Sequence, residues 1–221
     1  KQAPGDILMM TAAIRDLFKC YPNQYNVRVD TSCPHVWENN PYISKNVANA
    51  KFIKLGYPLV HKSNQCGLHF VNGFIQDLNT KLKLNIKLTD FKADIHFTEK
   101  EKSQRPVISG LDNNEPYWLM TSGGKTDFTA KWWDPGKWQY VVDALKGKVK
   151  FVQVGSAKHV HPPLKNVINM VGKTPTFRDA MVLALHSEGV CTIVTCFIHL
   201  FAALNKPCVC VAGGREPYTW E

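Results

Sequence analysis

The C-terminal third of the chain alternates short apolar runs with stretches of helical spacing. The apolar runs Val167–Met170, Val190–Val194 and Cys208–Ala212 have the length of strands. The stretches between them predict helices at Pro175–Ser187 and Phe197–Leu204. Because alternating short strands and helices are typical of parallel sheets, this region is predicted to be α/β.

The first of these helices has a recognisable beginning and end. Thr174 is a good N-cap residue, and Pro175 after it favours the first helical position. Gly189 is expected just beyond the end of the helix.

The same alternation extends upstream. Tyr117–Thr121 and Lys150–Val154 are predicted strands, and a helix is predicted between them from Asp134 to about Lys146. Tryptophans surround the start of this helix, and we expect at least two of them to pack the helix onto the sheet. They are Trp132, Trp133 and Trp138.

The N-terminal half is less regular. An apolar stripe predicts a helix that begins with Asp6 as its N-cap, and a second helix is predicted at His69–Leu82. Strands are predicted at Tyr25–Thr31, Ala50–Tyr57 and Ala93–Phe97.

The length of 221 residues suits one large domain or two small ones. The polar segment Glu99–Glu115 contains Pro and Gly and is the best candidate for a linker. This predicts two α/β domains, at residues 1–105 and 116–221, with a cleft between them.

The cysteines argue against a disulfide framework. Their number, seven, is odd, and several lie in apolar segments, where a free thiol packs as a small hydrophobic group. Their spacing matches no familiar zinc pattern, so no metal is predicted. We interpret this usage as typical of the reducing cytoplasm.

The net charge of +9 favours anionic partners such as nucleotides, nucleic acid or an acidic membrane surface. Lys and Arg are spread through the chain, without the dense cluster or the aromatic signature of a nucleic-acid module. Nucleic acid is therefore the less favoured partner.

The first candidate site follows the predicted strand Val190–Val194. A helix begins directly after it, so the free N–H groups of the helix would face the region where ligands of parallel sheets bind. Thr195 can cap this helix, Cys196 follows the cap, and His199 lies about one turn further on. The alternative is that Val190–Leu204 is only core. A membrane span is less favoured, because the run has 15 residues and a span needs about 20.

The second candidate is the segment Ser122-Gly123-Gly124-Lys125, with Lys131 six residues later. Glycines let the backbone approach an anion and lysines supply charge. The spacing is not that of a P-loop, and the alternative is a simple turn.

Two further groups have structural alternatives. Asp6 could act as a general base, but from the sequence pattern alone a helix N-cap is the favoured explanation. His159 and His161 lie in a Pro-bordered loop, for which a solvated surface loop is the default expectation.

Four segments together resemble glycosyltransferase family 9, the ADP-heptose:lipopolysaccharide heptosyltransferases and their relatives. They are GDILMMTAAIRDL, KWWDPGKW, NMVGKT and VTCFIHLFAALNKPCVCVAGG, in the same order and spacing over nearly the whole chain. The resemblance implies a GT-B architecture, with two Rossmann-like domains whose parallel sheets face a central cleft. Relative to that family, the first strand and the C-terminal end are expected to be missing, as in a fragment or a short member.

The residue patterns and the resemblance give one predicted set of site residues. Asp6 is the predicted catalytic base, and donor binding is assigned to Thr121, Ser122, Lys125, Lys131, Thr195, Cys196 and His199. The family's Asp-Thr-Gly motif is Val194-Thr195-Cys196 here. The acidic residue that binds ribose in the family is also absent, with Lys158 and His159 near its place. The diphosphate contacts are thus predicted to be kept, while those that select the nucleoside and sugar are not.

The main functional hypothesis is an inverting, metal-independent glycosyltransferase. It would use a nucleotide-diphosphate sugar, without another cofactor, on a glycan or lipid-linked acceptor in lipopolysaccharide-type biosynthesis, in the cytoplasm or at the inner membrane surface. One alternative is a catalytically degenerate relative that binds a nucleotide or glycan. A second is a basic nucleic-acid-binding protein, which predicts binding that weakens steeply with salt.

Overall fold

The computed structural model describes residues 3–56, 67–126 and 129–212. The chain divides into two compact units, with the boundary between His96 and Phe97. We call the described residues up to His96 the N-terminal unit and those from Phe97 to Ala212 the C-terminal unit. The polar stretch predicted as a linker lies in the C-terminal unit.

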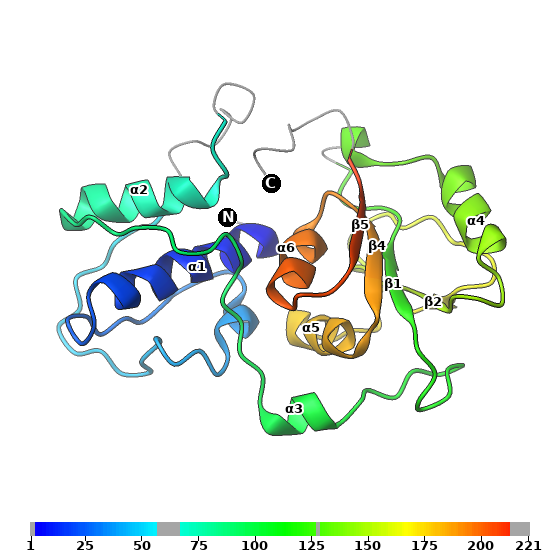
Figure 1. Ribbon diagram of the computed structural model, residues 1–221, viewed down its shortest axis with the longest axis horizontal. Coiled ribbons are helices and arrows are strands. Elements are labelled where there is room, and N and C mark those ends of the chain that lie inside the picture. The colour runs from blue at the N-terminus through cyan, green and yellow to red at the C-terminus, as the bar shows by residue number, and fades with distance from the viewer. Residues whose placement is uncertain (1–2, 57–66, 127–128, 213–221) are drawn as a thin grey trace. The chain divides into compact units, whose positions relative to one another are not determined.

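The C-terminal unit is built on a parallel sheet of five strands (Figure 1). The strands are β1 (Trp118–Thr121), β2 (Phe151–Gln153), β3 (Ile168–Asn169), β4 (Gly189–Ile193) and β5 (Cys208–Val211). They lie in the order β3-β2-β1-β4-β5, and every neighbouring pair is parallel. All five were predicted from the sequence.

Helices cover both faces of this sheet (Figure 1). The register places Met120 and Cys191 on one face, where α4 (Pro135–Ala144) packs, while α6 (Cys196–Ala203) contacts β4 and β5. The remaining helical segments of the unit are α3 (Glu99–Ser103), η3 (Thr129–Lys131) and α5 (Phe177–His186). As predicted, α4 begins after Asp134, whose Oδ1 accepts hydrogen bonds from the Gly136 and Lys137 amides.

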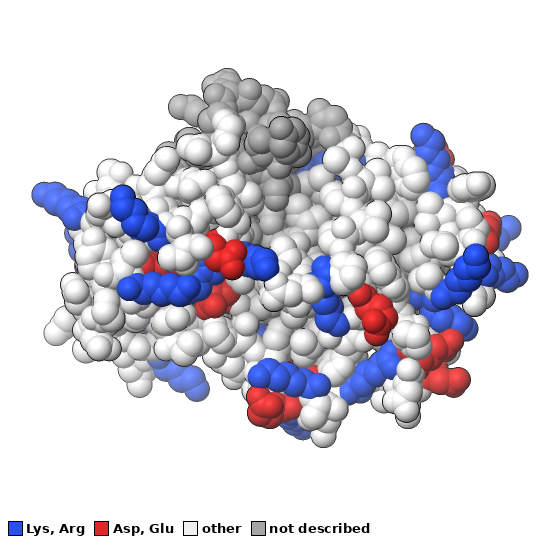
Figure 2. All heavy atoms as spheres, viewed as in Figure 1, with Lys and Arg blue, Asp and Glu red and all other residues white. Residues whose placement is uncertain are grey.

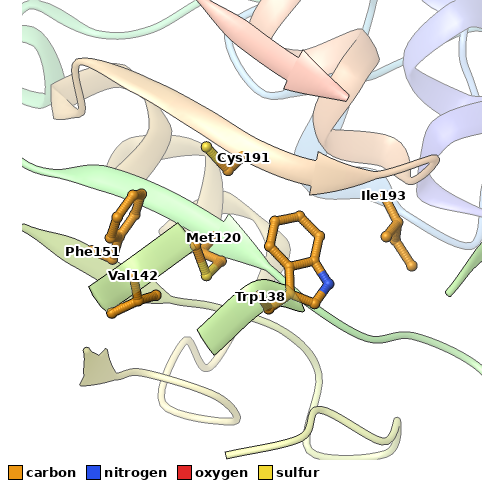
Figure 3. Packing of buried hydrophobic residues seen from close by; sticks show 6 residues of the cluster. All are labelled: Met120, Trp138, Val142, Phe151, Cys191 and Ile193. Carbon is orange, nitrogen blue, oxygen red and sulfur yellow. The ribbon is translucent and has the colours of Figure 1, made fainter. Parts of the chain in front are cut away.

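The core between α4 and the sheet is apolar and aromatic (Figure 3). Trp138 and Val142 of α4 pack against buried side chains from three strands: Met120, Phe151, Cys191 and Ile193. Trp133 meets Trp138 edge to face at 5.1 Å, and Trp132 also packs against the cluster. The prediction that at least two of these tryptophans pack the helix onto the sheet is confirmed.

The predicted start of α5 is wrong. The helix begins at Phe177, and its N-cap is Thr176, whose hydroxyl accepts from the Asp179 amide while the Asp179 carboxylate accepts from the Thr176 amide. This reciprocal pair explains why the helix begins there and not after Thr174. Gly189 lies beyond the end of the helix, as predicted, and is the first residue of β4. A Cβ there would lie 2.7 Å from the Trp118 ring.

An ion pair joins α3 to α5. The Arg178 guanidinium donates to both carboxylate oxygens of Glu101, at 2.7 and 2.8 Å, and lies 4.5 Å from the centre of the Phe97 ring. His186, at the end of α5, contacts the Glu101 carbonyl oxygen at 2.7 Å. These contacts hold the start of the C-terminal unit on α5.

The N-terminal unit is organised around α1 (Pro4–Cys20). Every residue from Ile7 to Leu17 is buried, and α1 contacts both η1 (Pro34–Trp37) and α2 (Val71–Leu82). Asp6 is not the N-cap but the third helical residue. Its Oδ2 accepts from the amide of the N-cap residue Ala3 at 2.8 Å, so it still stabilises the first turn.

A buried Arg15–Asp16 pair on α1 holds residues 89–92. Arg15 donates to the carbonyl oxygens of Asp90 and Lys92, and Asp16 accepts from the amide and hydroxyl of Thr89. The Arg15 guanidinium and the Thr89 donors lower the pKa of Asp16 against the opposing effect of burial, which is the largest influence on it. Each charge is therefore compensated inside the unit.

The strands predicted in the N-terminal half are wrong for the described residues. Exposure alternates along residues 25–31 as the pattern predicts, but the segment makes only one bridge, between Val27 and Ile43. Residues 50–56 and 93–97 also form no strand, and Tyr57 lies outside the described residues. The described part of this unit thus lacks the predicted parallel sheet. A sheet is stabilised by pairing between strands, and the alternation of polar and apolar residues in one segment does not show that a partner strand exists.

Candidate functional site at the ends of β1 and β4

The strand order places β1 and β4 side by side at the centre of the sheet. The chain runs from β1 outward through β2 to β3 and then returns to β4 on the other side of β1. In parallel α/β sheets, ligands bind beyond the carboxyl ends of the strands at such a reversal. Thr121–Lys125 lie at the end of β1 and Thr195–His199 follow β4, so the structure brings these two predicted groups to the same edge.

Three threonine hydroxyls connect the ends of these two strands. Thr192 Oγ1 bonds to Thr121 Oγ1 and lies 3.0 Å from Thr195 Oγ1. Thr192 donates its own proton to the Ile193 carbonyl oxygen at 2.7 Å, so it accepts from the other two hydroxyls. Thr195 Oγ1 in turn accepts from the Phe197 amide at 3.3 Å and caps α6, as predicted. All three hydroxyl protons are therefore used within the protein.

Ser122 makes a second connection, toward β2. Its Oγ accepts from Gln153 Nε2 at 2.8 Å, and the same amide group donates to the Pro162 carbonyl oxygen at 2.7 Å. Thr121 is 2% exposed and Ser122 is 1% exposed. In this structure both hydroxyls hold protein segments together, and direct contact with a donor phosphate stays a prediction.

The loop after β2 closes over the glycines of the site. The Val160 amide donates to the Gly124 carbonyl oxygen at 3.1 Å. A Cβ on Gly123 would lie 2.2 Å from the Val160 carbonyl oxygen, and a Cβ on Gly155 would lie 2.2 Å from the His161 ring. The space beside Gly123 is therefore filled by the backbone of this loop. The sequence had suggested that an anion would approach the backbone at this place.

His161 is not a solvated loop residue, contrary to the default expectation. Both ring nitrogens are buried, and neither has a hydrogen-bond partner among the described residues. Burial, with a smaller effect of the neighbouring His159, lowers the pKa of His161. The neutral ring is therefore the form that fits against Gly155. Sequence reasoning missed this closure, although glycines at the ends of two strands gave a signal for it.

The helix start beyond β4 is built as the sequence predicts. Cys196 is the first residue of α6 and is half-buried, and the N-terminal amides of the helix provide a positive dipole end. His199 lies one turn further on and is 7% exposed. The end of β4 thus combines a capped helix N-terminus with a nearby imidazole, an arrangement suited to an anion.

The two predicted lysines differ in their surroundings. Lys125 is exposed just beyond the Gly-Gly pair, and Lys131 ends η3 and is half-buried. Trp132, directly after Lys131, returns to the site, because its Nε1 would lie 3.6 Å from a Cβ on Gly124. Because Trp132 lies beside Gly124, the adjacent Lys131 is also brought toward the end of β1. Asp6 lies in the N-terminal unit, and its catalytic role stays a prediction.

In the described ranges, no group of three His, Cys, Asp or Glu side chains could hold a metal ion. Across those same ranges, no helix is long and apolar enough to cross a membrane. On the face shown in Figure 2, Lys and Arg are dispersed with Asp and Glu among them and form no continuous basic patch.

No protein-family model and no curated protein sequence matches the chain. Solved structures do match. The ADP-heptose LPS heptosyltransferase II of E. coli is 16% identical, with a TM-score of 0.66 over 95% of this chain and 82% of that chain. The glycosyl transferase family 9 protein of Veillonella parvula is 14% identical, with a TM-score of 0.66 over 95% of this chain and 77% of that chain.

A third similar structure is TibC of enterotoxigenic E. coli, a dodecameric glycosyltransferase described as iron-containing and also solved with ADP-D-beta-D-heptose. It is 16% identical, with a TM-score of 0.68 over 100% of this chain and 58% of that chain. The chain therefore shares its fold with heptosyltransferases and a family 9 glycosyltransferase, and the resemblance predicted from its motifs is confirmed at the level of the fold.

Proposed function

We propose that this protein is a glycosyltransferase that moves a sugar from a nucleotide-diphosphate donor to a hydroxyl of a glycan or lipid-linked acceptor. The observation that carries the proposal is the edge where β1 and β4 end, with the capped start of α6 beside it, in a fold shared with a protein solved with ADP-heptose. We place the donor diphosphate at this edge.

The proposed chemistry requires the negative charge that develops on the leaving diphosphate to be stabilised. The N-terminal amides of α6, the Lys131 ammonium and the His199 ring are the groups that we assign to this role. Lys125, Thr195 and Cys196 belong to the same binding surface. We propose that no metal takes part, since these donors can act on the leaving group themselves.

The acceptor hydroxyl needs a base, and we assign that role to Asp6. Attack on the sugar from the side opposite the leaving diphosphate would invert the anomeric centre. Asp6 is half-buried, and its Oδ2 accepts a hydrogen bond from the Ala3 amide. We propose that its carboxylate takes the proton of the acceptor hydroxyl. We further propose a cytoplasmic location, and the predicted domain ranges 1–105 and 116–221 remain part of this proposal.

One observation favours a second candidate, a relative that binds a nucleotide sugar without turnover. Val194 provides only a methyl surface at the end of β4, where an Asp would offer a carboxylate to sugar hydroxyls. The hydroxyls of Thr121 and Ser122 are also engaged within the protein. A sugar hydroxyl left unpaired against Val194 would cost about 1–3 kcal/mol.

Release of nucleoside diphosphate separates the two candidates. The protein is incubated with ADP-heptose and with ADP-, UDP- and GDP-hexoses, and free nucleoside diphosphate is measured with and without glycan acceptors. A transferase releases it at a rate that acceptor increases and that Asp6→Asn abolishes. Saturable donor binding by calorimetry without any release would support the binding protein and refute the transferase.

A further inference from the structure

The described segments at the carboxyl edge of the sheet carry more positive than negative charge. The described segments at this edge are 122–126, 129–134, 154–162, 170–176 and 194–199, and their lysines are Lys125, Lys131, Lys158 and Lys173. The only carboxylate in these segments is that of Asp134, which is occupied with the amides at the start of α4. Two of the lysines, Lys125 and Lys131, belong to the diphosphate site proposed above. The other two lie at the ends of β2 and β3 and have no role in that function.

The sequence around Lys158 and Lys173 contains nothing to neutralise them. No Asp or Glu occurs between Asp143 and Asp179. Lys150 precedes β2, and its Nζ lies 3.3 Å from Glu115 at the opposite edge of the sheet. No ion pair involves Lys158 or Lys173 within the described part of the chain, and both side chains are exposed.

The two loops that carry these lysines are fixed to each other. The Gly172 amide donates to the Gly155 carbonyl oxygen at 2.8 Å. A Cβ on Gly172 would lie 2.8 Å from the Ala157 Cβ, and the φ of Gly172 is +72°, so only glycine fits there without strain. The loop that bears Lys158 is therefore in direct contact with the loop that bears Lys173.

The loop after β2 is also fixed to β1. The Val160 amide donates to the Gly124 carbonyl oxygen, and Gln153 Nε2 donates to the Pro162 carbonyl oxygen, so the loop is held across the ends of both strands. Lys158 and His159 lie on the turn of this loop, where the Lys158 amide donates to Ser156 Oγ at 3.2 Å. These basic residues are thus held beside the proposed diphosphate site by main-chain contacts.

In nucleotide-binding sheets of this strand order, the residue that meets the ribose follows the second strand. An Asp or Glu there binds the ribose hydroxyls, and a basic residue accommodates a phosphate on the ribose. Here that position has Lys158 and His159 and no acidic residue. We propose that the ends of β2 and β3 bind a phosphate ester on the ribose of the donor nucleotide, through Lys158 and Lys173. This inference rests on the proposed function for the adjoining diphosphate.

The test compares nucleotides that differ only in the ribose phosphate. Binding of ADP, of its 2′-phosphate and 3′-phosphate derivatives, and of ADP with added inorganic phosphate is measured by calorimetry at one ionic strength. We expect at least one derivative to bind roughly tenfold or more tightly than ADP, with no gain from free phosphate, because a charge-assisted contact is added.

Variants make the assignment specific. Lys158→Gln and Lys173→Gln should each bring the affinity ratio of derivative to ADP below about threefold. Lys148→Gln removes an exposed lysine from the segment before β2, at the opposite edge, and should leave the ratio as it is.

The possible failures are distinguishable. If ADP binds but both derivatives bind within twofold of it, the inference is overturned and the proposed function stands. If the affinity ratio of derivative to ADP falls equally in Lys148→Gln, the change reflects a general effect of charge, and the inference is also overturned. If ADP, UDP and GDP all fail to bind, the diphosphate site is refuted, and with it both proposals.

Discussion

The ion pair between α3 and α5 allows a stability prediction in which a single charge is removed. In Glu101→Gln, one oxygen remains to accept from Arg178, but the charge is lost. Glu101 Oε2 also accepts from the Thr98 amide at 2.8 Å and its hydroxyl at 2.9 Å, so the change weakens the N-cap of α3 as well. We expect this substitution to destabilise the C-terminal unit.

The size of the effect follows from the surroundings of the pair. The side chains of Arg178 and Glu101 are 8% and 22% exposed. The hydrogen bond from Arg178, with further bonds from Thr98, lowers the pKa of Glu101 from 4.5 to about 2. At about 1.4 kcal/mol for each unit of pKa, the charged form is favoured by roughly 3 kcal/mol. Because Glu101 retains some contact with solvent, we expect a loss of about 2–3 kcal/mol in the free energy of unfolding at pH 7.

The loss should depend on pH in a defined direction. A carboxyl group whose pKa is lower in the folded state contributes its full stability above its unfolded pKa, here 4.5, and loses it as the pH falls toward about 2. Gln resembles the protonated carboxyl group. The difference between Glu101→Gln and the unchanged protein should therefore be constant above pH 5 and shrink toward zero near pH 2.

The measurement is urea unfolding followed by tryptophan fluorescence, since Trp118, Trp132, Trp133 and Trp138 all lie in the C-terminal unit. Glu99→Gln is the matched control. Glu99 is in the same helix, but its side chain is 89% exposed, so its pair with Lys102 should contribute no measurable stability. If Glu101→Gln costs less than about 0.5 kcal/mol at pH 7, or if the difference does not change between pH 5 and pH 2.5, the reasoning is refuted.

Three further predictions concern the candidate site. Thr192→Val leaves the Thr121 hydroxyl buried without an acceptor and should lower the free energy of unfolding by about 1–3 kcal/mol. The double variant Thr121→Val/Thr192→Val should recover much of this, and additive losses in urea unfolding would contradict the coupling of the two hydroxyls. Lys131→Ala should weaken nucleoside-diphosphate binding by about 1.5–3 kcal/mol in calorimetry, and an unaltered affinity would remove Lys131 from the site. Asp6→Asn should reduce turnover by about 10²–10⁴-fold with donor binding nearly intact, because Asn retains an oxygen for the Ala3 amide; a variant that keeps more than about a tenth of the rate shows that Asp6 only stabilises the helix.

The two units differ in how well the sequence predicts them. The central strands β1, β2 and β4 are almost fully buried, so each is an apolar run that stands out from its flanks. The edge strands β3 and β5 are more exposed, but their sequences are also short apolar runs, and all five strands were predicted. In residues 25–31 the same reasoning failed. Their alternation describes which side chains face solvent, and it does so correctly, but it contains no information on whether a partner strand lies alongside.

The site was predictable to the level of strand ends and no further. The cap by Thr195 could be predicted because it is a local interaction across two residues. The partners of Thr121 and Ser122 could not, because Thr192 and Gln153 come next to them only through the strand order and register. The same applies to Gly123, whose neighbour Val160 is brought in by a loop from the next strand.

The contacts of Gly123 and Gly155 limit how this site can change during evolution or redesign. A Cβ on Gly123 would lie 2.2 Å from the Val160 carbonyl oxygen, so Gly123 cannot vary while that loop stays in place. A Cβ on Gly155 would lie 2.2 Å from the His161 ring, so Gly155 cannot vary while that ring keeps its buried position. Ser156 and Lys158 are exposed on the turn of the loop and face no such restriction, whereas Ala157 lies against Gly172. A new ligand preference can therefore arise by exchanging the exposed residues of this turn while the two glycines stay unchanged.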